Sequence, residues 1–286
     1  VVESLITKSN FKYFEMKLSI ITINYNNAIG LKKTIESLIE QSYQEYEYIV
    51  IDGGSDDGSK EVIWESLRYV SSWCSEKDTG VYNAMNKGIM RATGEYLLFL
   101  NSGDYLYDST VLEDVTSTLS GEDIIYGDLL YVENGVEREV CVYPTTLNLD
   151  YFFEHSLGHP ATFIKRSLFQ DSLYSEDLKI VSDWEFFLKK IVLEEVSYRH
   201  ISRTITAFGM GGISSQIDAC NEEREMVLRK FFPSMLRDAL KAAAHMKKQP
   251  LYELFWELSN TRRFQHRIKP VIAFLVGLNK CFSRRR

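Results

Sequence analysis

The stretch that decides the fold is Glu95-Tyr96-Leu97-Leu98-Phe99-Leu100-Asn101-Ser102-Gly103-Asp104. Its apolar centre, residues 97–100, is too short for a helix and lies between Gly94 and Gly103, which favours a strand buried on both faces. In open parallel sheets built from such strands, ligands bind beyond the carboxyl ends of the strands. The stretch therefore predicts a buried strand that ends in a site, with Asp104 placed for chemistry.

The residues before this strand alternate between strand patterns and helix patterns. Strands are predicted over residues 17–24, 48–52 and 71–75. Apolar residues at helical spacing connect these strands and lead into residue 95. The alternation is typical of an α/β fold with a doubly wound, mostly parallel sheet and helices on both faces. After Asp104, the strands predicted at 124–128 and 138–143 have no helix between them, which indicates a more mixed sheet.

Three regions are expected along the chain. Residues 1–15 are expected to be an N-terminal extension, residues 16–219 the α/β domain, and residues 220–286 a helical C-terminal region. The last part of this region combines apolar residues at helical spacing with many Lys and Arg residues. Such a basic amphipathic helix suits an anionic membrane surface, and the alternative is that it packs on the body or on a second subunit.

The net charge of -7 conceals a strong asymmetry between two parts of the chain. Residues 261–286 contain eight Lys or Arg and no acid, so the preceding 260 residues carry a net charge of -15. An acidic body argues against nucleic-acid binding. The four cysteines are far apart, which predicts neither a zinc site nor a disulfide framework and suits a reducing cytoplasm. No segment approaches the roughly 20 apolar residues that span a bilayer, and no signal peptide is expected.

Carboxylates follow three of the predicted strands: Asp52, Asp78 and Asp104. Because the carboxyl ends of parallel strands meet at one edge of a sheet, we expect these side chains to face a common ligand. A metal-bound diphosphate needs hard oxygen ligands and a divalent cation, and Asp104 is the best single candidate for a ligand. The alternative is that acidic residues are simply common in loops between strands and helices.

The loop that follows Asp52 is rich in glycine but matches no nucleotide-binding motif. The pattern Gly-x-Gly-x-x-Gly is absent, and Ser59-Lys60 reverses the Lys-Ser/Thr order of a P-loop. Asp52 can instead accept hydrogen bonds from a base or ribose, while Gly53 and Gly54 allow the backbone to approach a ligand closely. The alternative reading is a tight turn.

Four segments in combination resemble the family 2 glycosyltransferases, which have the GT-A fold. These segments are residues 21–26, 50–59, 76–88 and 94–104. The Ile-Asp-Gly-Gly-Ser strand end and the Tyr-x-Ala-Met-Asn-Lys-Gly helix are similar to bacterial polysaccharide-assembly enzymes. The resemblance implies inverting transfer of a sugar from a nucleotide-diphosphate donor to a hydroxyl of a glycan or lipid-linked acceptor. It also implies a divalent metal, Mn or Mg, and a cytoplasmic location, peripheral on the inner face of the cell membrane.

The resemblance further implies which residues bind the nucleotide sugar. Carried over by position, Asn24 and Asp52 would hold the nucleoside, and Asp78 would contact its base or ribose. Asn101 begins the segment that stands where the family has its Asp-x-Asp-type metal motif. Asn101 departs from the usual acid, but it still offers a neutral oxygen to the nucleotide sugar or its metal.

The metal ligand and the catalytic base are likewise implied by the resemblance. Asp104 matches the metal-binding aspartate, and Ser182-Asp183-Trp184 resembles the acidic catalytic motif, in which Asp183 would be the general base. Residues 182–185 also have the Ser-x-x-Glu spacing of a capping box, so the alternative is that Asp183 only stabilises a helix N-terminus. His159 is a candidate contact for the acceptor or the diphosphate, or else a structural residue beside proline.

Two other functions stay open at the level of sequence. A sugar-nucleotide pyrophosphorylase has a similar core, but its glycine-rich nucleotide loop is missing after the first strand. A non-catalytic carbohydrate-binding or membrane-binding relative is kept open by Asn101, which removes one acid from the metal motif.

Overall fold

The strands that end in the predicted site form the parallel part of the sheet. A computed structural model describes residues 17–212, 216–250, 252–259, 265 and 268–274. Strands β1 (Leu18–Asn24), β2 (Glu47–Asp52), β3 (Ser72–Ser75) and β4 (Tyr96–Phe99) pair in parallel in the order β3-β2-β1-β4. Every side chain of β1 and β4 is buried, as the continuous apolar runs predict. The predicted doubly wound sheet is confirmed, and Asp104 lies just beyond the carboxyl end of β4.

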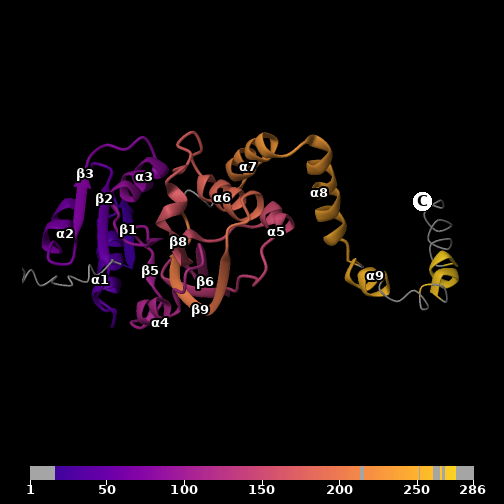
Figure 1. Cartoon of the computed structure of the whole chain (residues 1–286), viewed down its shortest axis with the longest axis horizontal. Helices are drawn as coiled ribbons and strands as arrows, with labels where there is room; N and C mark the ends of the chain where they lie inside the picture. Colours follow the sequence, from indigo (N-terminus) through magenta and orange to yellow (C-terminus); the bar gives the residue numbers. More distant parts are fainter. Residues whose placement is uncertain (1–16, 213–215, 251, 260–264, 266–267, 275–286) are drawn as a thin grey trace, which may run out of the picture. The chain divides into compact units, whose positions relative to one another are not determined.

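Helices connect these strands and cover both faces of the sheet. They are α1 (Ala28–Ile39), α2 (Ser59–Glu65) and α3 (Val81–Arg91). Figure 1 shows α2 and α3 on opposite sides of β1, β2 and β3. The α1 helix begins after Asn27, whose side chain accepts a hydrogen bond from the Gly30 N–H at 3.1 Å. This arrangement leaves the carboxyl ends of the strands open to a ligand.

Gly88 allows α3 to pack closely on β1. A Cβ atom at this position would lie 2.4 Å from Cγ2 of the fully buried Ile21. We therefore expect Gly88→Ala to destabilise the protein by about 1–3 kcal/mol, although alanine is the better helix former. Urea unfolding measures this change, and Met90→Ala at an exposed position of the same helix is the control, expected to shift stability by about 0.5 kcal/mol or less. An unchanged urea midpoint for Gly88→Ala would contradict the close packing.

The second half of the domain extends the sheet with mixed pairing. Its strands are β5 (Tyr105–Leu106), β6 (Ile124–Glu133), β7 (Val136–Cys141), β8 (Thr162–Lys165) and β9 (Tyr198–Gly209). β8 pairs antiparallel with both β4 and β6, and β9 runs parallel to β6. At the edges, β7 pairs antiparallel with β6, and β5 pairs antiparallel with β9. The mixed sheet predicted after Asp104 is confirmed. The helical segments of this half are α4 (Val111–Thr118), α5 (Leu149–Glu154), α6 (Ser182–Phe187), the 3-10 turns η1 (His159–Ala161) and η2 (Arg166–Phe169), and the π-helical turn η3 (Leu188–Leu193).

The C-terminal region is helical, as predicted. It contains α7 (Ile217–Phe231), α8 (Ser234–Lys247) and α9 (Tyr252–Ser259). The chain forms two compact units, residues 1–227 and 228–286, so the boundary falls within α7. The predicted extension at 1–15 and most of the predicted basic tail lie outside the described residues. Within the described part, no helix has the length and apolar character that crossing a membrane requires.

Candidate active site

A cavity of about 820 Å³ lies beyond the carboxyl ends of β1, β2 and β4. Its walls come from the segments that follow these strands, from the start of α3, from the residues before α6 and from the end of β9. Residues far apart in the sequence therefore meet at one place. The predicted site residues that line the cavity are Asn24, Asp78, Asn101, Asp104, His159 and Asp183.

Asp52 is the predicted site residue that the structure does not place in the cavity wall. Its carboxylate is fully buried and accepts hydrogen bonds from the hydroxyls of Ser55 and Ser75, each at 2.5 Å, and from the Asn24 amide at 2.8 Å. Burial alone would raise the pKa of Asp52, but these hydrogen bonds outweigh burial and hold the pKa below its ordinary value. Asp52 therefore fixes the loop after β2 and orients Asn24, which does line the cavity.

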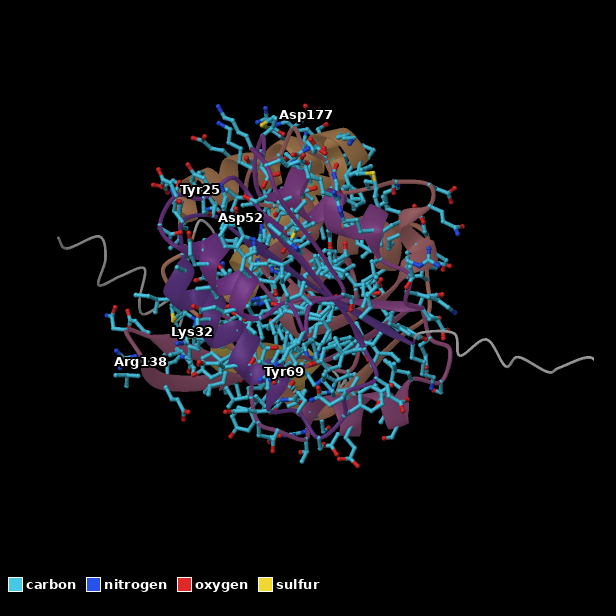
Figure 2. The ribbon with its side chains drawn as sticks, turned by 90° about the vertical axis from the view of Figure 1, so that its left-hand side faces the viewer. Tyr25, Lys32, Asp52, Tyr69, Arg138 and Asp177 are labelled. Atoms are coloured by element: carbon cyan, nitrogen blue, oxygen red, sulfur yellow. The ribbon has the colours of Figure 1, made fainter. Side chains whose placement is uncertain are left out.

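The end of the cavity near β2 combines an exposed aromatic ring with a carboxylate. Figure 2 shows Tyr25 towards the periphery and Asp52 deeper inside, in agreement with a Tyr25 side chain that is 68% exposed. A Cβ atom at Gly53 would lie 3.0 Å from the Asp78 carboxylate and 3.1 Å from the Tyr25 ring, so the glycine permits this close approach. Lys87 holds Asp78 through an ion pair of 2.5 Å. This end offers a flat ring and a fixed hydrogen-bond acceptor to a ligand.

Asp104 is a buried acid at the base of the cavity. Only 5% of the residue is exposed, and its Oδ1 accepts a hydrogen bond from the Gly209 N–H at 3.0 Å. Burial raises the pKa of Asp104 to about 7, although the hydrogen bond from the Gly209 N–H opposes this shift. The ionised form of Asp104 is therefore costly unless a cation lies beside it.

The residues around Asp104 fit a hard divalent cation. Asn101 contributes a buried Oδ1 that has no hydrogen-bond partner among the described residues, and Asp104 contributes a carboxylate. Both are oxygen donors of the kind that Mg²⁺ and Mn²⁺ accept, and a cation would relieve the cost of burying the Asp104 charge. No cluster of three or more His, Cys, Asp or Glu suited to a metal occurs in the part of the chain that the structure describes, so the remaining ligands would come from substrate or water.

Asp183 lies in the first turn of α6 and faces the same cavity. Its Oδ1 accepts hydrogen bonds from the Tyr82 hydroxyl and the Trp184 N–H, both at 2.9 Å, and its Oδ2 accepts one from His159 Nδ1 at 3.0 Å. Burial would raise the pKa of Asp183, but the hydrogen bonds from His159 and Tyr82 overcome burial and keep the pKa below its ordinary value. The carboxylate is therefore ionised, with one acceptor position of Oδ2 left for a ligand hydroxyl.

His159 links Asp183 to Asn101. Its Nδ1 lies 3.0 Å from Asp183 Oδ2, and its Nε2 lies 3.0 Å from Asn101 Nδ2. Because the carboxylate can only accept, Nδ1 carries the proton in this contact and Nε2 is the acceptor from Asn101. His159 thus joins the proposed metal end of the cavity to the carboxylate of α6.

The capping box predicted at residues 182–185 is wrong. The α6 helix begins at Ser182 itself, Val181 occupies the cap position, and the Ser182 hydroxyl has no hydrogen-bond partner among the described residues. The prediction that Asp183 sits in the first helical turn is confirmed. The helix begins one residue earlier than the Ser-x-x-Glu spacing predicts, because the Val181 carbonyl already accepts the first helical hydrogen bond, from the Glu185 N–H at 2.8 Å.

Sequence reasoning missed several residues of the cavity. Tyr82 begins the Tyr-x-Ala-Met-Asn-Lys-Gly helix of the resemblance, and nothing in that motif indicated that its hydroxyl reaches Asp183, which is 101 residues away. Lys179 also lines the cavity, four residues before Asp183. A lysine in a loop carries no signal by itself, so only the fold could identify it.

Known proteins resemble this chain in sequence and in fold. The family model described as glycosyl transferase family 2 matches residues 19–166. An uncharacterized glycosyltransferase of Mycobacterium tuberculosis is 32% identical over 68% of this chain and 76% of its own length, and a PGL/p-HBAD biosynthesis glycosyltransferase of Mycobacterium bovis is 27% identical over 70% and 79%.

Two solved structures show the same fold at low sequence identity. Residues 1–349 of S. aureus TarS, in complex with UDP, are 20% identical with a TM-score of 0.60, covering 79% of this chain and 69% of that one. The mannosyltransferase PcManGT of Pyrobaculum calidifontis, in complex with GDP-Man and Mn²⁺, is 14% identical with a TM-score of 0.58, covering 95% and 81%. The chain spans 43% of the longer TarS chain. On the family match and the relatives, this chain belongs to glycosyltransferase family 2 and is a glycosyltransferase of the GT-A fold.

Proposed function

We propose that this enzyme transfers a sugar from a nucleotide-diphosphate donor to an acceptor hydroxyl, with inversion at the anomeric carbon. The observation that carries the proposal is that one cavity joins Asn24 and Asp78, at the strand ends, to the ionised Asp183 of α6. Proteins of the same fold are complexed with UDP, UDP-GlcNAc or GDP-Man, which supports a nucleotide sugar as the donor. Membership of the family favours transfer over the pyrophosphorylase alternative.

The nucleoside is proposed to occupy the end of the cavity formed by Tyr25, Asn24 and Asp78. The exposed Tyr25 ring offers a stacking surface, and the Asp78 carboxylate, fixed by Lys87, offers an acceptor for a base N–H or a ribose hydroxyl. Asp52 contributes indirectly, because its hydrogen bonds hold Asn24 and the loop after β2 in place.

The diphosphate is proposed to lie near Asn101 and Asp104. These residues would hold Mn²⁺ or Mg²⁺, which supplies positive charge to the leaving diphosphate. The buried, unpartnered Asn101 Oδ1 and the high pKa of Asp104, about 7, support this placement, as does the Mn²⁺ complex of a protein with the same fold.

Asp183 is proposed to accept the proton of the acceptor hydroxyl. As the new bond forms between the acceptor oxygen and the anomeric carbon, the bond from that carbon to the diphosphate oxygen breaks, and the nucleoside diphosphate leaves. Attack from the face opposite to the leaving group gives inversion. The single proton of the Tyr82 hydroxyl has two acceptors, Asp183 at 2.9 Å and the Ile180 carbonyl at 2.6 Å. The Tyr82 hydroxyl is therefore shared between Asp183 Oδ1 and the Ile180 carbonyl, and Oδ2 is proposed to take the proton of the acceptor.

A panel of nucleotide sugars tests the proposal directly. Release of nucleoside diphosphate is measured for UDP-sugars and GDP-sugars, with Mn²⁺, with Mg²⁺ and with chelator. We expect release with one donor class, dependence on the metal, and a product of inverted anomeric configuration by NMR. A protein that binds donor but releases no nucleotide with any sugar would contradict turnover and support the non-catalytic relative.

The acceptor is proposed to be lipid-linked, presented at an anionic membrane on the inner face. Residues 228–286 contain fourteen Lys or Arg and three acids, and Met235 of α8 is 83% exposed. The transfer is proposed to serve bacterial surface polysaccharide assembly, and a relative named as a PGL/p-HBAD biosynthesis glycosyltransferase gives loose support for a role in biosynthesis.

Deletion of residues 261–286 tests the membrane part of this proposal. Each Lys or Arg near an anionic surface contributes about 1 kcal/mol, so removal of eight is expected to abolish most co-sedimentation with phosphatidylglycerol vesicles. Phosphatidylcholine vesicles are the control and should bind neither form. Equal co-sedimentation of both forms would contradict the proposal, and a change of oligomeric state instead would favour packing of the tail on protein.

A further inference from the structure

Glu223 of α7 holds the segment that leads into Asp183. Its Oε1 accepts a hydrogen bond from the Lys179 N–H at 2.8 Å, and its Oε2 accepts hydrogen bonds from the N–H groups of Ile180 and Val181 at 2.9 and 3.1 Å. We propose that Glu223 is a positioning residue for the catalytic base, acting through these three hydrogen bonds, which we term the Glu223 contact. The proposal rests on the proposed function, in which Asp183 is that base.

The Glu223 contact supplies acceptors to three N–H groups of the segment that leads into α6. Val181 occupies the cap position of α6 but has no side chain that can accept a hydrogen bond, and the Ser182 hydroxyl makes no cap. Backbone N–H groups need acceptors, and hydrogen bonds to a carboxylate are stronger than those to neutral groups. Glu223 supplies both oxygens from another helix, so the direction in which α6 leaves this segment depends on α7.

The segment held by Glu223 is also part of the active site. Lys179 and Ile180 line the cavity. The Ile180 carbonyl is also one of the two acceptors of the Tyr82 hydroxyl, and Asp183 is the other. Movement of this segment would therefore displace a wall of the cavity, one partner of Tyr82 and the start of the helix that carries Asp183.

The next residue of α7 holds the chain on the other side of Asp183. The Arg224 guanidinium lies 5.1 Å from the centre of the Trp184 ring, and its Nη1 donates to the Glu154 carbonyl at 3.4 Å. Consecutive residues of α7 thus contact residues 179–181 before Asp183 and Trp184 after it. This two-sided contact fixes Asp183 against the acceptor position without touching the strand ends that are proposed to bind the donor.

Glu223→Gln tests the proposal, with Glu222→Gln as the matched control. Glutamine has one acceptor oxygen in place of two, so at least one N–H of residues 179–181 loses its partner. Glu222 lies beside Glu223 on α7 and is exposed, so its change should leave activity and exchange unaltered. We expect faster amide hydrogen exchange at residues 179–181 and a kcat about 10- to 100-fold lower in Glu223→Gln, because small displacements of catalytic groups have effects of this size. The donor KM should stay within about twofold, because the donor contacts are unchanged.

Two further variants make the outcome decisive. In an Asp183→Asn background, Glu223→Gln should lower the residual activity by less than about twofold, because both changes act on the same step. Glu223→Asp keeps the charge at shorter reach, should give an intermediate kcat, and replaces Glu223→Gln in the comparison if the latter fails to fold.

The outcomes separate this proposal from the proposed function. Faster exchange with an unchanged kcat would overturn the positioning role, and unchanged exchange would overturn the Glu223 contact itself. A third outcome is that the wild type transfers no sugar from any donor while Glu223→Gln still shows faster exchange at residues 179–181. This outcome would overturn the proposed function, and with it the effect of the Glu223 contact on catalysis. A rise in donor KM equal to the fall in kcat/KM would also overturn the proposal, because the defect would then lie in donor binding.

Discussion

Asp183→Asn is expected to fold normally and to lower sugar transfer by about 100- to 10,000-fold, the usual contribution of a positioned general base. Asparagine has nearly the same shape and can still accept hydrogen bonds from Tyr82 and the Trp184 N–H, but it cannot take a proton from the acceptor. Steady-state kinetics with the donor found in the nucleotide-sugar panel measures the loss. The donor KM should change little, because Asp183 is not among the residues proposed to bind the nucleoside.

Asp177→Asn is the matched control for this prediction. Asp177 is an exposed acid in the segment that leads to the same helix, and Figure 2 shows it at the periphery of the molecule. Its variant should retain full activity. If Asp183→Asn retained activity close to that of the wild type, Asp183 would have only the structural role at the start of α6.

The lowered pKa of Asp183 also predicts a pH dependence of stability. The folded protein holds the Asp183 proton less tightly than the unfolded chain does, so the ionised carboxylate stabilises the fold at neutral pH. That stability is lost as pH falls through the folded-state pKa of Asp183.

Asp104→Asn is expected to change stability and activity in opposite directions. The folded-state pKa of Asp104, about 7, lies above its ordinary value of 3.8. The folded protein therefore keeps a proton that the unfolded chain has already released, and the stability of the metal-free protein falls as pH rises from about 4 to 7. Above that range the penalty is fully present, and Asp104→Asn should be more stable than the metal-free wild type at pH 8 by about 2–4 kcal/mol. Urea unfolding at pH 5 and pH 8 measures the difference, which should shrink at the lower pH.

The same variant should lose its response to Mn²⁺. A cation held by Asp104 in the folded state stabilises the wild type by about 2.7 kcal/mol at one hundred times its Kd, and transfer should depend on it. Asp104→Asn should show neither effect, whereas Asp56→Asn, at an exposed position of the loop after β2, should behave as the wild type. A wild type whose unfolding and activity ignore Mn²⁺ and Mg²⁺ would refute metal binding at Asn101 and Asp104.

The parallel sheet could be predicted from sequence because its signals are local. The continuous apolar runs of β1, β2 and β4 match strands buried on both faces, and the site lies where polar residues end these runs. The resemblance to a known family added Asp183, which no local pattern could have joined to Asp104. Beyond residue 105, the sequence singled out His159 and Asp183 as site residues, but it did not identify Lys179, Ile180 and Phe208 as residues of the cavity wall.

Other parts of the site could not be predicted because they depend on distant contacts. Asp52 ends a strand as Asp104 does, yet Ser55, Ser75 and Asn24 bury it, and only the folded chain distinguishes the two acids. The cap of α6 was misassigned for a related reason, since the residues before it are held by Glu223 and not by a local side chain. Nothing in the sequence around Glu223 indicates that its side chain binds the backbone of residues 179–181.

Glu223 and Arg224 of α7 limit where this enzyme can be truncated or recombined with its relatives. A chain ended at the predicted domain boundary, residue 219, would keep every residue proposed to touch substrate and yet lack Glu223 and Arg224. Recombination that exchanges the C-terminal helices between relatives would preserve the active site only if the crossover falls after Arg224, about two turns into α7. The shortest segment that keeps the active site intact therefore includes the start of α7, although the sequence pattern assigns α7 to the C-terminal region.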